Sequence, residues 1–352
     1  MLNMKSLNPI PVAGNPASPY TRKMLALMRY RRICYTVEWG DPRNLIKKMK
    51  LEEPKPMLLP VIIFNVDGQN KAITDSTPII RHLENEFTLR SVIPSDPKLN
   101  FLNYVLEDFG DEWVTKYMFH YRWHFSNDIE KAGTILPLMH DVSLDDTSHL
   151  EFKKYISELQ TSRLWVVGSN QKTAPIIEAS YKRFLKKLDY CLSLNPYLFG
   201  KRPSSSDYAI YGQLTQLVGF DPTSSNIAHA VSPRVIAWID QMEDMSGIDV
   251  HQEDWINFED VENNLSGLFQ EIGKVYVPAL LANANAIDTK EKIWKTNIDG
   301  TEWEQQSFPY QAKCLKWIND EFSALDEDDQ KQITSFLEKT GCENLIVRSK
   351  ND

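Results

Sequence analysis

The apolar pattern of the chain changes near residue 94, and this change limits the folds that the chain can adopt. Before it, short β-rich runs alternate with amphipathic helical runs, which is typical of a layered α/β unit with parallel strands. After it, helical periodicity dominates and strand signals nearly disappear. The sequence between them, IPSDPKLN at residues 93–100, has the turn-rich composition of a linker. We therefore expect an α/β domain at residues 1–92, an all-helical domain at 98–247 and a C-terminal extension at 248–352.

Local start and turn signals predict the individual elements. In the first domain we expect strands at residues 10–13, 34–39, 58–66 and 71–74, with helices opened by Ser18-Pro19 and by residues 75–78. In the helical domain, the periodicity predicts helices at 102–125, 151–159, 174–194, 206–218 and 233–245, with a polar loop at 144–149. In the extension, we expect one long helix at 258–287 kinked by Pro278, a hairpin at 293–305 about Asp299-Gly300, and helices at 311–322 and 328–340.

Composition excludes several classes of function. The chain has 39 Lys and Arg against 48 Asp and Glu, a net charge of −9, which repels the phosphate backbone of a nucleic acid. The four cysteines form no CxxC or CxxH pair, so neither a zinc site nor a disulfide framework is indicated. No stretch reads as a signal peptide or a membrane span. We expect a cytoplasmic protein with reduced thiols, no metal, and no nucleic-acid or membrane partner.

Four segments carry a resemblance to a known family. In order they are ASPYTRK at residues 17–23, LLPV at 58–61, ITDSTPII at 73–80 and PSSSDYA at 203–209. Their order and spacing resemble those of the cytosolic glutathione transferases over about the first 245 residues. The resemblance implies a thioredoxin-like N-terminal domain, an all-helical glutathione-transferase domain, glutathione as co-substrate and a two-fold homodimer. The α-rich extension with its β-hairpin falls outside the resemblance.

Ser18 is the candidate catalytic residue that this resemblance implies. A hydroxyl at a helix N-terminus can donate to the glutathione sulfur and favour the nucleophilic thiolate. Serine before proline is also a common helix cap, and the two roles are compatible. Relatives that exchange disulfides have cysteine at this position, so serine favours addition or substitution chemistry. Cys34 remains a weak alternative thiol, which we interpret as a small buried side chain.

The other implied glutathione contacts are Leu59-Pro60 and Asp75-Ser76. The first pair resembles the family's cis-proline, where the residue before proline offers its backbone to the cysteinyl part of glutathione; a trans proline at a strand edge is the alternative. The second pair resembles the acidic-Ser pair that holds the γ-glutamyl end. There the Ser76 hydroxyl would take the carboxylate and Asp75 would balance the ammonium, although ordinary helix capping predicts the same backbone.

The resemblance also suggests an electrophile pocket along the first long helix of the helical domain. The candidate residues are Tyr20, Trp113, Tyr117, His120 and Tyr121; packing in the core is the alternative for these aromatic side chains. His120 and His124 share a helix face as a metal pair would, but no third ligand has a fixed spacing, so we favour partly buried histidines. Ser204 and Asp207 are expected to form a capping box, and residues 326–329 an acidic helix start.

These observations support one functional hypothesis and two alternatives. The first is a glutathione transferase that conjugates the glutathione thiolate to a hydrophobic electrophile, with a role in detoxification. The alternatives are a non-catalytic binding or scaffold protein that keeps the fold, and a glutathione-dependent isomerase or peroxidase that uses the same site. We expect residues 248–352 to dock on the first two domains, where they narrow the electrophile site; alternatively they thicken the helical domain or extend the dimer contact.

Overall fold

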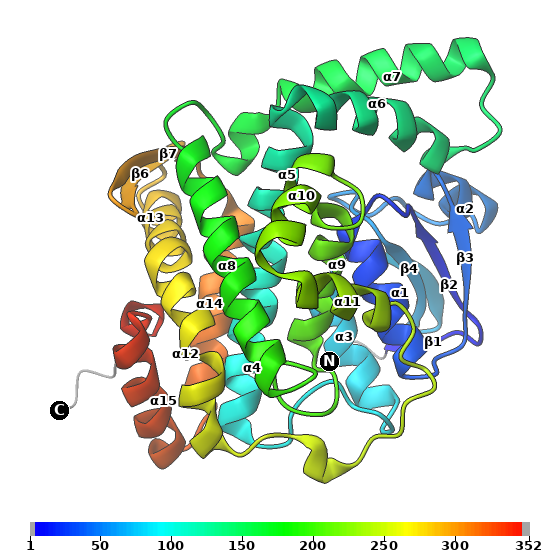
Figure 1. Ribbon diagram of the computed structural model, residues 1–352. Helices are drawn as coiled ribbons and strands as arrows, with labels where there is room; N and C mark the ends of the chain where they lie inside the picture. The colour runs from blue at the N-terminus through cyan, green and yellow to red at the C-terminus, as the bar shows by residue number, and fades with distance from the viewer. Residues whose placement is uncertain (1–3, 347–352) are drawn as a thin grey trace.

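The computed structural model describes residues 4–346 of the chain (Figure 1). A small sheet with three helices lies at one side, a body of long helices occupies the centre, and the C-terminal elements run along α8 and α4. The predicted fold class, an α/β unit followed by helices and a late β-hairpin, is confirmed. The exact division at residues 92, 98 and 247 stays a prediction.

The N-terminal sheet is mixed rather than parallel. Strands β2 (Ile10–Gly14) and β3 (Tyr35–Trp39) are parallel, as expected for a βαβ unit. Strand β4 (Val61–Val66) runs antiparallel to β2, to the hairpin partner β5 (Gln69–Ile73) and to a short strand, β1 (Met4–Ser6), which the pattern did not predict. Asp67 and Gly68 form the hairpin turn with φ of 53° and 84°, which a glycine adopts at little cost.

Three helices accompany the sheet, and each begins at a side-chain cap. Helix α1 (Pro19–Tyr30) begins after Ser18, whose side-chain oxygen accepts the Thr21 N–H at 3.2 Å, with proline in the first position. Helix α3 (Ser76–Glu86) begins after Asp75. The sequence analysis did not predict the short helix α2 (Pro42–Lys48), which Asp41 caps and Pro42 opens. Proline at a first helical position is a start signal rather than a break.

The helical part contains more helices than the periodicity predicted. The expected single helix at 102–125 is two, divided at Trp113, and residues 146–149 of the expected loop already belong to α7. Two helices were not predicted: α6, which contains Pro137, and α10, whose first turn is rich in serine. The helices are α4 (Pro97–Glu112), α5 (Val114–His124), α6 (Ser126–His140), α7 (Asp146–Thr161), α8 (Ala174–Leu194), α9 (Ser205–Leu217), α10 (Pro222–Val231) and α11 (Pro233–Met242).

The predicted capping signals are confirmed. Ser204 and Asp207 form a capping box at the start of α9. The acidic run near the C-terminus begins α15 (Glu327–Thr340), where Asp326 accepts the Asp329 N–H, and Gly341 ends this helix with φ of 73°. These signals succeed because a cap depends on residues within one turn of it.

The C-terminal segment consists of helices around a hairpin. Strands β6 (Ile293–Ile298) and β7 (Thr301–Gln306) pair as predicted, and α14 (Pro309–Ser323) follows them. The expected long helix is α12 (Val261–Glu271) and α13 (Val277–Asp288), joined by a π-helical turn at Ile272–Tyr276. Pro278 lies in the first turn of α13, directly after the π-helical turn, so the regular helix is interrupted where the missing proline N–H predicts a disturbance.

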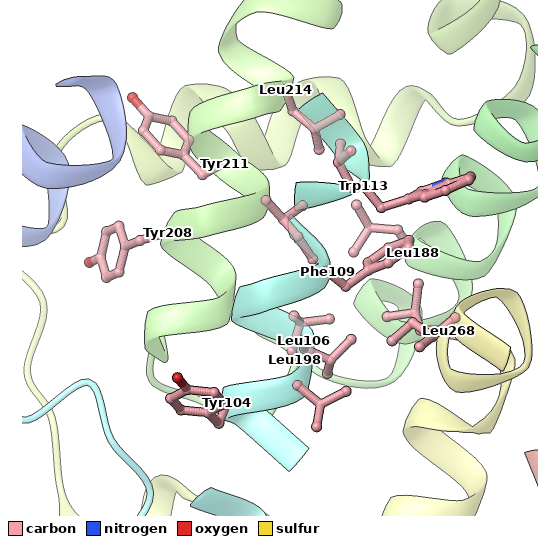
Figure 2. Close-up of a cluster of buried hydrophobic side chains, with 14 of the residues drawn as sticks. Tyr104, Leu106, Phe109, Trp113, Leu188, Leu198, Tyr208, Tyr211, Leu214 and Leu268 are labelled. Atoms are coloured by element: carbon pink, nitrogen blue, oxygen red, sulfur yellow. The ribbon is translucent and has the colours of Figure 1, made fainter. Parts of the chain in front are cut away.

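The C-terminal segment shares the core of the helical part. Figure 2 shows Leu268 of α12 beside Leu188 and Phe109. The Trp113 ring lies 5.7 Å from the Trp303 ring, measured between centroids, and both side chains are fully buried. The same packing brings the start of α14 to the N-terminal unit, where the Tyr310 hydroxyl donates to Asp75 at 3.0 Å.

Candidate functional site

One cavity collects the segments that the sequence motifs single out. Its volume is about 580 Å³. The start of α1, the stretch before β4 and the start of α3 all open onto it, and α4, α5 and α14 complete the wall. The lining residues are Ser18, Pro19, Tyr20, Pro56, Met57, Leu58, Leu59, Asp75, Ser76, Asp111, Glu112, Met118 and Tyr310.

Ser18 lies in this wall at the N-terminus of α1, half-buried. Its Oγ accepts the cap bond from Thr21, which leaves its own O–H to donate elsewhere. The N-terminus of a helix adds a partial positive charge beside this hydroxyl. The position therefore suits an anion placed in the cavity, which is the environment that the serine hypothesis requires.

Leu59 also lines the cavity, and Pro60 lies buried behind it. The Leu59-Pro60 peptide bond is cis, as the resemblance implies. The backbone of Leu59 therefore lies at the cavity wall, ahead of β4. Whether it binds a ligand stays a prediction.

Asp75 and Ser76 lie at the start of α3, on the same cavity. Asp75 has a φ of 81°, an unusual backbone conformation for a residue with a side chain, and its carboxylate accepts the Thr77 N–H at 3.3 Å. Burial raises the pKa of Asp75, against the opposing effect of the Tyr310 hydroxyl and Lys23. The Asp75 carboxylate is thus held by neutral donors, since the ammonium of Lys23 bonds to other groups.

Lys23 is the central residue that sequence reasoning missed. It is fully buried in α1, and its ammonium donates to Ser76 Oγ at 3.0 Å, to Glu107 Oε1 at 3.0 Å and to Asp111 Oδ2 at 2.6 Å. Arg81 reaches the other oxygen of Glu107 at 2.9 Å. This network connects the start of α3 to α4 directly behind the cavity. A buried lysine in an otherwise apolar helix face carries no local signal that would reveal it.

Two carboxylates of α4, Asp111 and Glu112, form part of the cavity wall. Burial raises the pKa of Asp111 to about 7, although Lys23 opposes this shift. Burial also raises the pKa of Glu112 to about 8, with a further contribution from the neighbouring carboxylates. Glu112 accepts a bond from the Gln311 amide of α14 at 3.3 Å. The sequence analysis assigned neither residue to the site.

The structure brings only one of the five expected electrophile-pocket residues to the cavity. Tyr20 lines it, and its hydroxyl donates to the Asp111 carbonyl at 2.7 Å. The expectation for the other four is wrong, because their side chains are completely buried in the core and do not line the cavity: Trp113, Tyr117, His120 and Tyr121. Met118 is the α5 residue that lines it.

These four side chains are buried because other elements pack against this aromatic face. The Tyr117 hydroxyl bonds to Ser180 Oγ of α8 at 2.6 Å, and Trp113 packs against Trp303 of the hairpin. Helix α8 and the C-terminal segment therefore bury the face that the resemblance assigned to a ligand. The resemblance did not cover that segment and gave no sign of what it would bury.

The two histidines of α5 stack on each other, with ring centroids 4.6 Å apart. Burial, with a smaller effect from His124, lowers the pKa of His120 to about 3, so this ring is neutral. The Nδ1 atom of His120 lies 2.8 Å from Ser169 Oγ.

Within residues 4–346, no group of three or more His, Cys, Asp or Glu is arranged to hold a metal ion. None of the helices in this range is long and apolar enough to cross a membrane.

Cys34 differs from its expected environment. We interpreted it as a small buried side chain, and the structure leaves it exposed as a free thiol just before β3. It does not line the cavity, so the site chemistry does not involve it.

Comparisons with known proteins agree with this architecture. Residues 13–91 match the family described as glutathione S-transferase, N-terminal domain. No curated protein matches the chain. Among solved structures, FzlA from C. crescentus is 15% identical and has a TM-score of 0.41, with 66% of this chain and 87% of that chain covered.

Two further solved structures are similar at the same level. The Tau class glutathione S-transferase MiGSTU from mango, Mangifera indica L., is 15% identical with a TM-score of 0.40, covering 73% of this chain and 96% of that one. A glutathione transferase family member from Pseudomonas fluorescens pf-5, solved with two glutathione bound, is 15% identical with a TM-score of 0.39, covering 66% and 87%. By its match to the family model alone, the chain carries at residues 13–91 an N-terminal domain of the glutathione S-transferase family, with the thioredoxin-like fold that its motifs predict.

Proposed function

We propose that the protein is a glutathione transferase that joins the glutathione thiolate to a hydrophobic electrophile. The observation that carries this proposal is the convergence of Ser18, Leu59, Asp75 and Ser76 on one cavity. Solved relatives with 15% identity or less include a transferase with two glutathione bound and a maleylacetoacetate isomerase with glutathione in its active site. The two-fold homodimer belongs to the same proposal.

Each residue has one task in this proposal. The γ-glutamyl carboxylate lies at the Ser76 hydroxyl and at the Ser76 backbone N–H that begins α3, with the charge of Lys23 behind the hydroxyl. Asp75 balances the γ-glutamyl ammonium, and the backbone of Leu59 pairs with the cysteinyl residue. Ser18 donates its O–H to the sulfur and so favours the thiolate at neutral pH.

Two measurements test the proposal against its alternatives. Retention of the full chain on immobilised glutathione tests binding, and turnover with a neutral aryl halide tests conjugation. Binding with turnover supports the transferase. Binding without turnover supports a scaffold role, and turnover of an organic hydroperoxide alone supports a peroxidase. If the protein neither binds nor turns over, the proposed function is wrong.

Ser76→Ala should weaken glutathione binding by about 10-fold, because one hydrogen bond to a charged carboxylate is worth about 1.5–3 kcal/mol at most and the backbone N–H of residue 76 remains. The rate at saturating glutathione should change much less, since this end of the tripeptide does not react. Calorimetric titration measures the affinity. Ser148→Ala is the control, because its hydroxyl also lies in the first turn of a helix but is exposed and remote from the cavity wall. Equal affinities for all three proteins would remove Ser76 from the site.

Tyr310→Phe should bind glutathione about 2- to 10-fold more tightly, because the Tyr310 hydroxyl occupies the Asp75 carboxylate that the ammonium needs, and such a bond is worth about 0.5–1.5 kcal/mol. The same titration measures the change. Tyr190→Phe is the matched control, since it removes an exposed tyrosine bond to Asn263. Weaker binding by Tyr310→Phe would show that the tyrosine holds glutathione instead of competing with it.

A further inference from the structure

The cavity combines an apolar wall with three carboxylates. Asp75, Asp111 and Glu112 line it, and among the residues that the structure describes, no Lys, Arg or His does. The remaining wall is largely apolar, with side chains of methionine, leucine and proline. An apolar body with a positively charged group would complement both features.

Asp111 has an oxygen that lacks a partner. The side chain is only 8% exposed, and while Oδ2 accepts from Lys23 at 2.6 Å, Oδ1 has no hydrogen-bond partner within the described part of the chain. A buried carboxylate oxygen without a donor costs free energy. Asp111 lines the cavity, but Oδ1 itself is buried, so a ligand in the cavity can supply that donor after a small rotation of the carboxylate.

The neighbouring cations are already engaged. Lys23 is shared among Ser76, Glu107 and Asp111, and Arg81 bonds to Glu107. Lys116 donates to the Gln305 amide oxygen at 3.0 Å. The carboxylates of Asp75 and Glu112 accept side-chain bonds only from the neutral groups of Tyr310 and Gln311. When Asp111 and Glu112 are ionised, the wall thus holds more negative charge than its own cations balance. Because burial raises the pKa of Asp111 to about 7 and that of Glu112 to about 8, an ammonium group that binds near neutral pH should displace protons from them.

We propose that this cavity binds a molecule with a protonated amine on an apolar body, with the ammonium group between Asp111 and Glu112. In the context of the proposed function, on which this assignment rests, that molecule is the second substrate, so the preferred electrophiles are organic cations. Glutathione carries two carboxylates and one ammonium, and its thiolate adds a further negative charge. A cationic second substrate offsets this charge beside the acidic wall, so the two ligands should bind with positive coupling.

The test compares three probes of equal chain length on the full-length protein: hexylammonium, hexan-1-ol and hexanoate. Calorimetric titration at pH 8 should give an affinity for hexylammonium at least about 10-fold higher than for hexan-1-ol, and no measurable binding of hexanoate. Saturating glutathione should increase the affinity for hexylammonium. If hexylammonium binds no more tightly than hexan-1-ol, the proposal is wrong.

Two variants locate the ammonium group. Asp111→Asn and Glu112→Gln keep the size of each side chain but remove its charge and replace one acceptor oxygen with an NH2 donor. Each should lose about 10-fold in affinity for hexylammonium while its affinity for hexan-1-ol is unchanged. Asp328→Asn makes the same charge change at a side chain that is 87% exposed and should have no effect. If both cavity variants bind hexylammonium as the parent does, the assigned position is wrong.

The outcomes separate this inference from the proposed function. Retention on glutathione without any preference for hexylammonium overturns the inference alone. A preference for hexylammonium without retention supports the cation site and overturns the transferase proposal. If saturating glutathione instead displaces hexylammonium, the two carboxylates hold glutathione's own ammonium, and the assignment to a second substrate is wrong.

Discussion

Replacing Ser18 with alanine should lower the turnover of glutathione by about 10- to 1000-fold, the range seen when one positioned donor to a developing or full anion is removed. The hydroxyl lies at the cavity wall and at the positive end of α1, where it would donate to the sulfur. Affinity for glutathione should change little, because the peptide ends bind elsewhere in the cavity. Steady-state kinetics with an aryl halide, at saturating glutathione, measures the effect.

The cap bond of Ser18 requires two controls. Loss of the bond to Thr21 should itself lower the free energy of unfolding by about 1 kcal/mol. Asp326→Ala removes a similar cap from α15, away from the cavity, and should lose similar stability with no change in rate. Ser18→Thr keeps a hydroxyl and should recover part of the activity. Wild-type turnover by Ser18→Ala would end the catalytic assignment.

The parts of the fold that were predicted correctly depend on neighbouring residues in the chain. Ser18 with Pro19, Ser204 with Asp207, and Asp299 with Gly300 each determine a cap or a turn within four residues. The errors arose where one residue type has two local meanings. Proline can begin a helix or break one, and it begins α2 and α10, two helices that the sequence analysis did not predict.

The site residues likewise fall into two groups, those that local motifs identified and those that depend on contacts between distant segments. The motifs around Ser18, Leu59 and Ser76 were identified because each lies at the junction of a loop and an element, where sequence and backbone are closely linked. The Lys23 bond to Asp111 joins residues 88 positions apart, and the Tyr310 bond to Asp75 joins residues 235 positions apart. Such contacts depend on how whole elements pack, which no local pattern records.

The C-terminal segment determines which neighbouring side chains are buried in the core and which line the cavity. By burying Trp113 against Trp303, it turns a helix face that resembled a ligand wall into core. By placing Tyr310 and Gln311 beside Asp75 and Glu112, it contributes to the cavity instead. The hypothesis that residues 248–352 narrow the electrophile site therefore remains open to a test, and Tyr310 is the side chain on which to perform it.

Replacing Lys23 with methionine should lower the free energy of unfolding by about 3–5 kcal/mol, because removing one member of a buried ionic network leaves its partners charged and unpaired. Asp111 loses its short bond to the ammonium, and Glu107 loses one of its two cations but keeps Arg81, Thr77 and Ser205. Methionine has a similar length, so the loss reports on charge more than on volume. Urea denaturation followed by tryptophan fluorescence measures the change at pH 8.

The pH dependence distinguishes this network from ordinary packing. In the parent, burial tends to raise the pKa of Glu107, but Arg81 and Lys23 lower it to about 2. The contribution of Glu107 to the free energy of unfolding is therefore lost only as the pH falls from about 4.5 toward 2. In Lys23→Met, the pKa values of Glu107 and Asp111 should rise, and the folded variant should take up protons as the pH falls from 8 to 5.5. The destabilisation should therefore be smaller at pH 5.5 than at pH 8.

The control is Lys48→Met, which removes an exposed ion pair with Glu38 and should lower the free energy of unfolding by less than about 1 kcal/mol at both pH values. A loss as small as that of the control, or one that does not shrink in acid, would contradict the buried network.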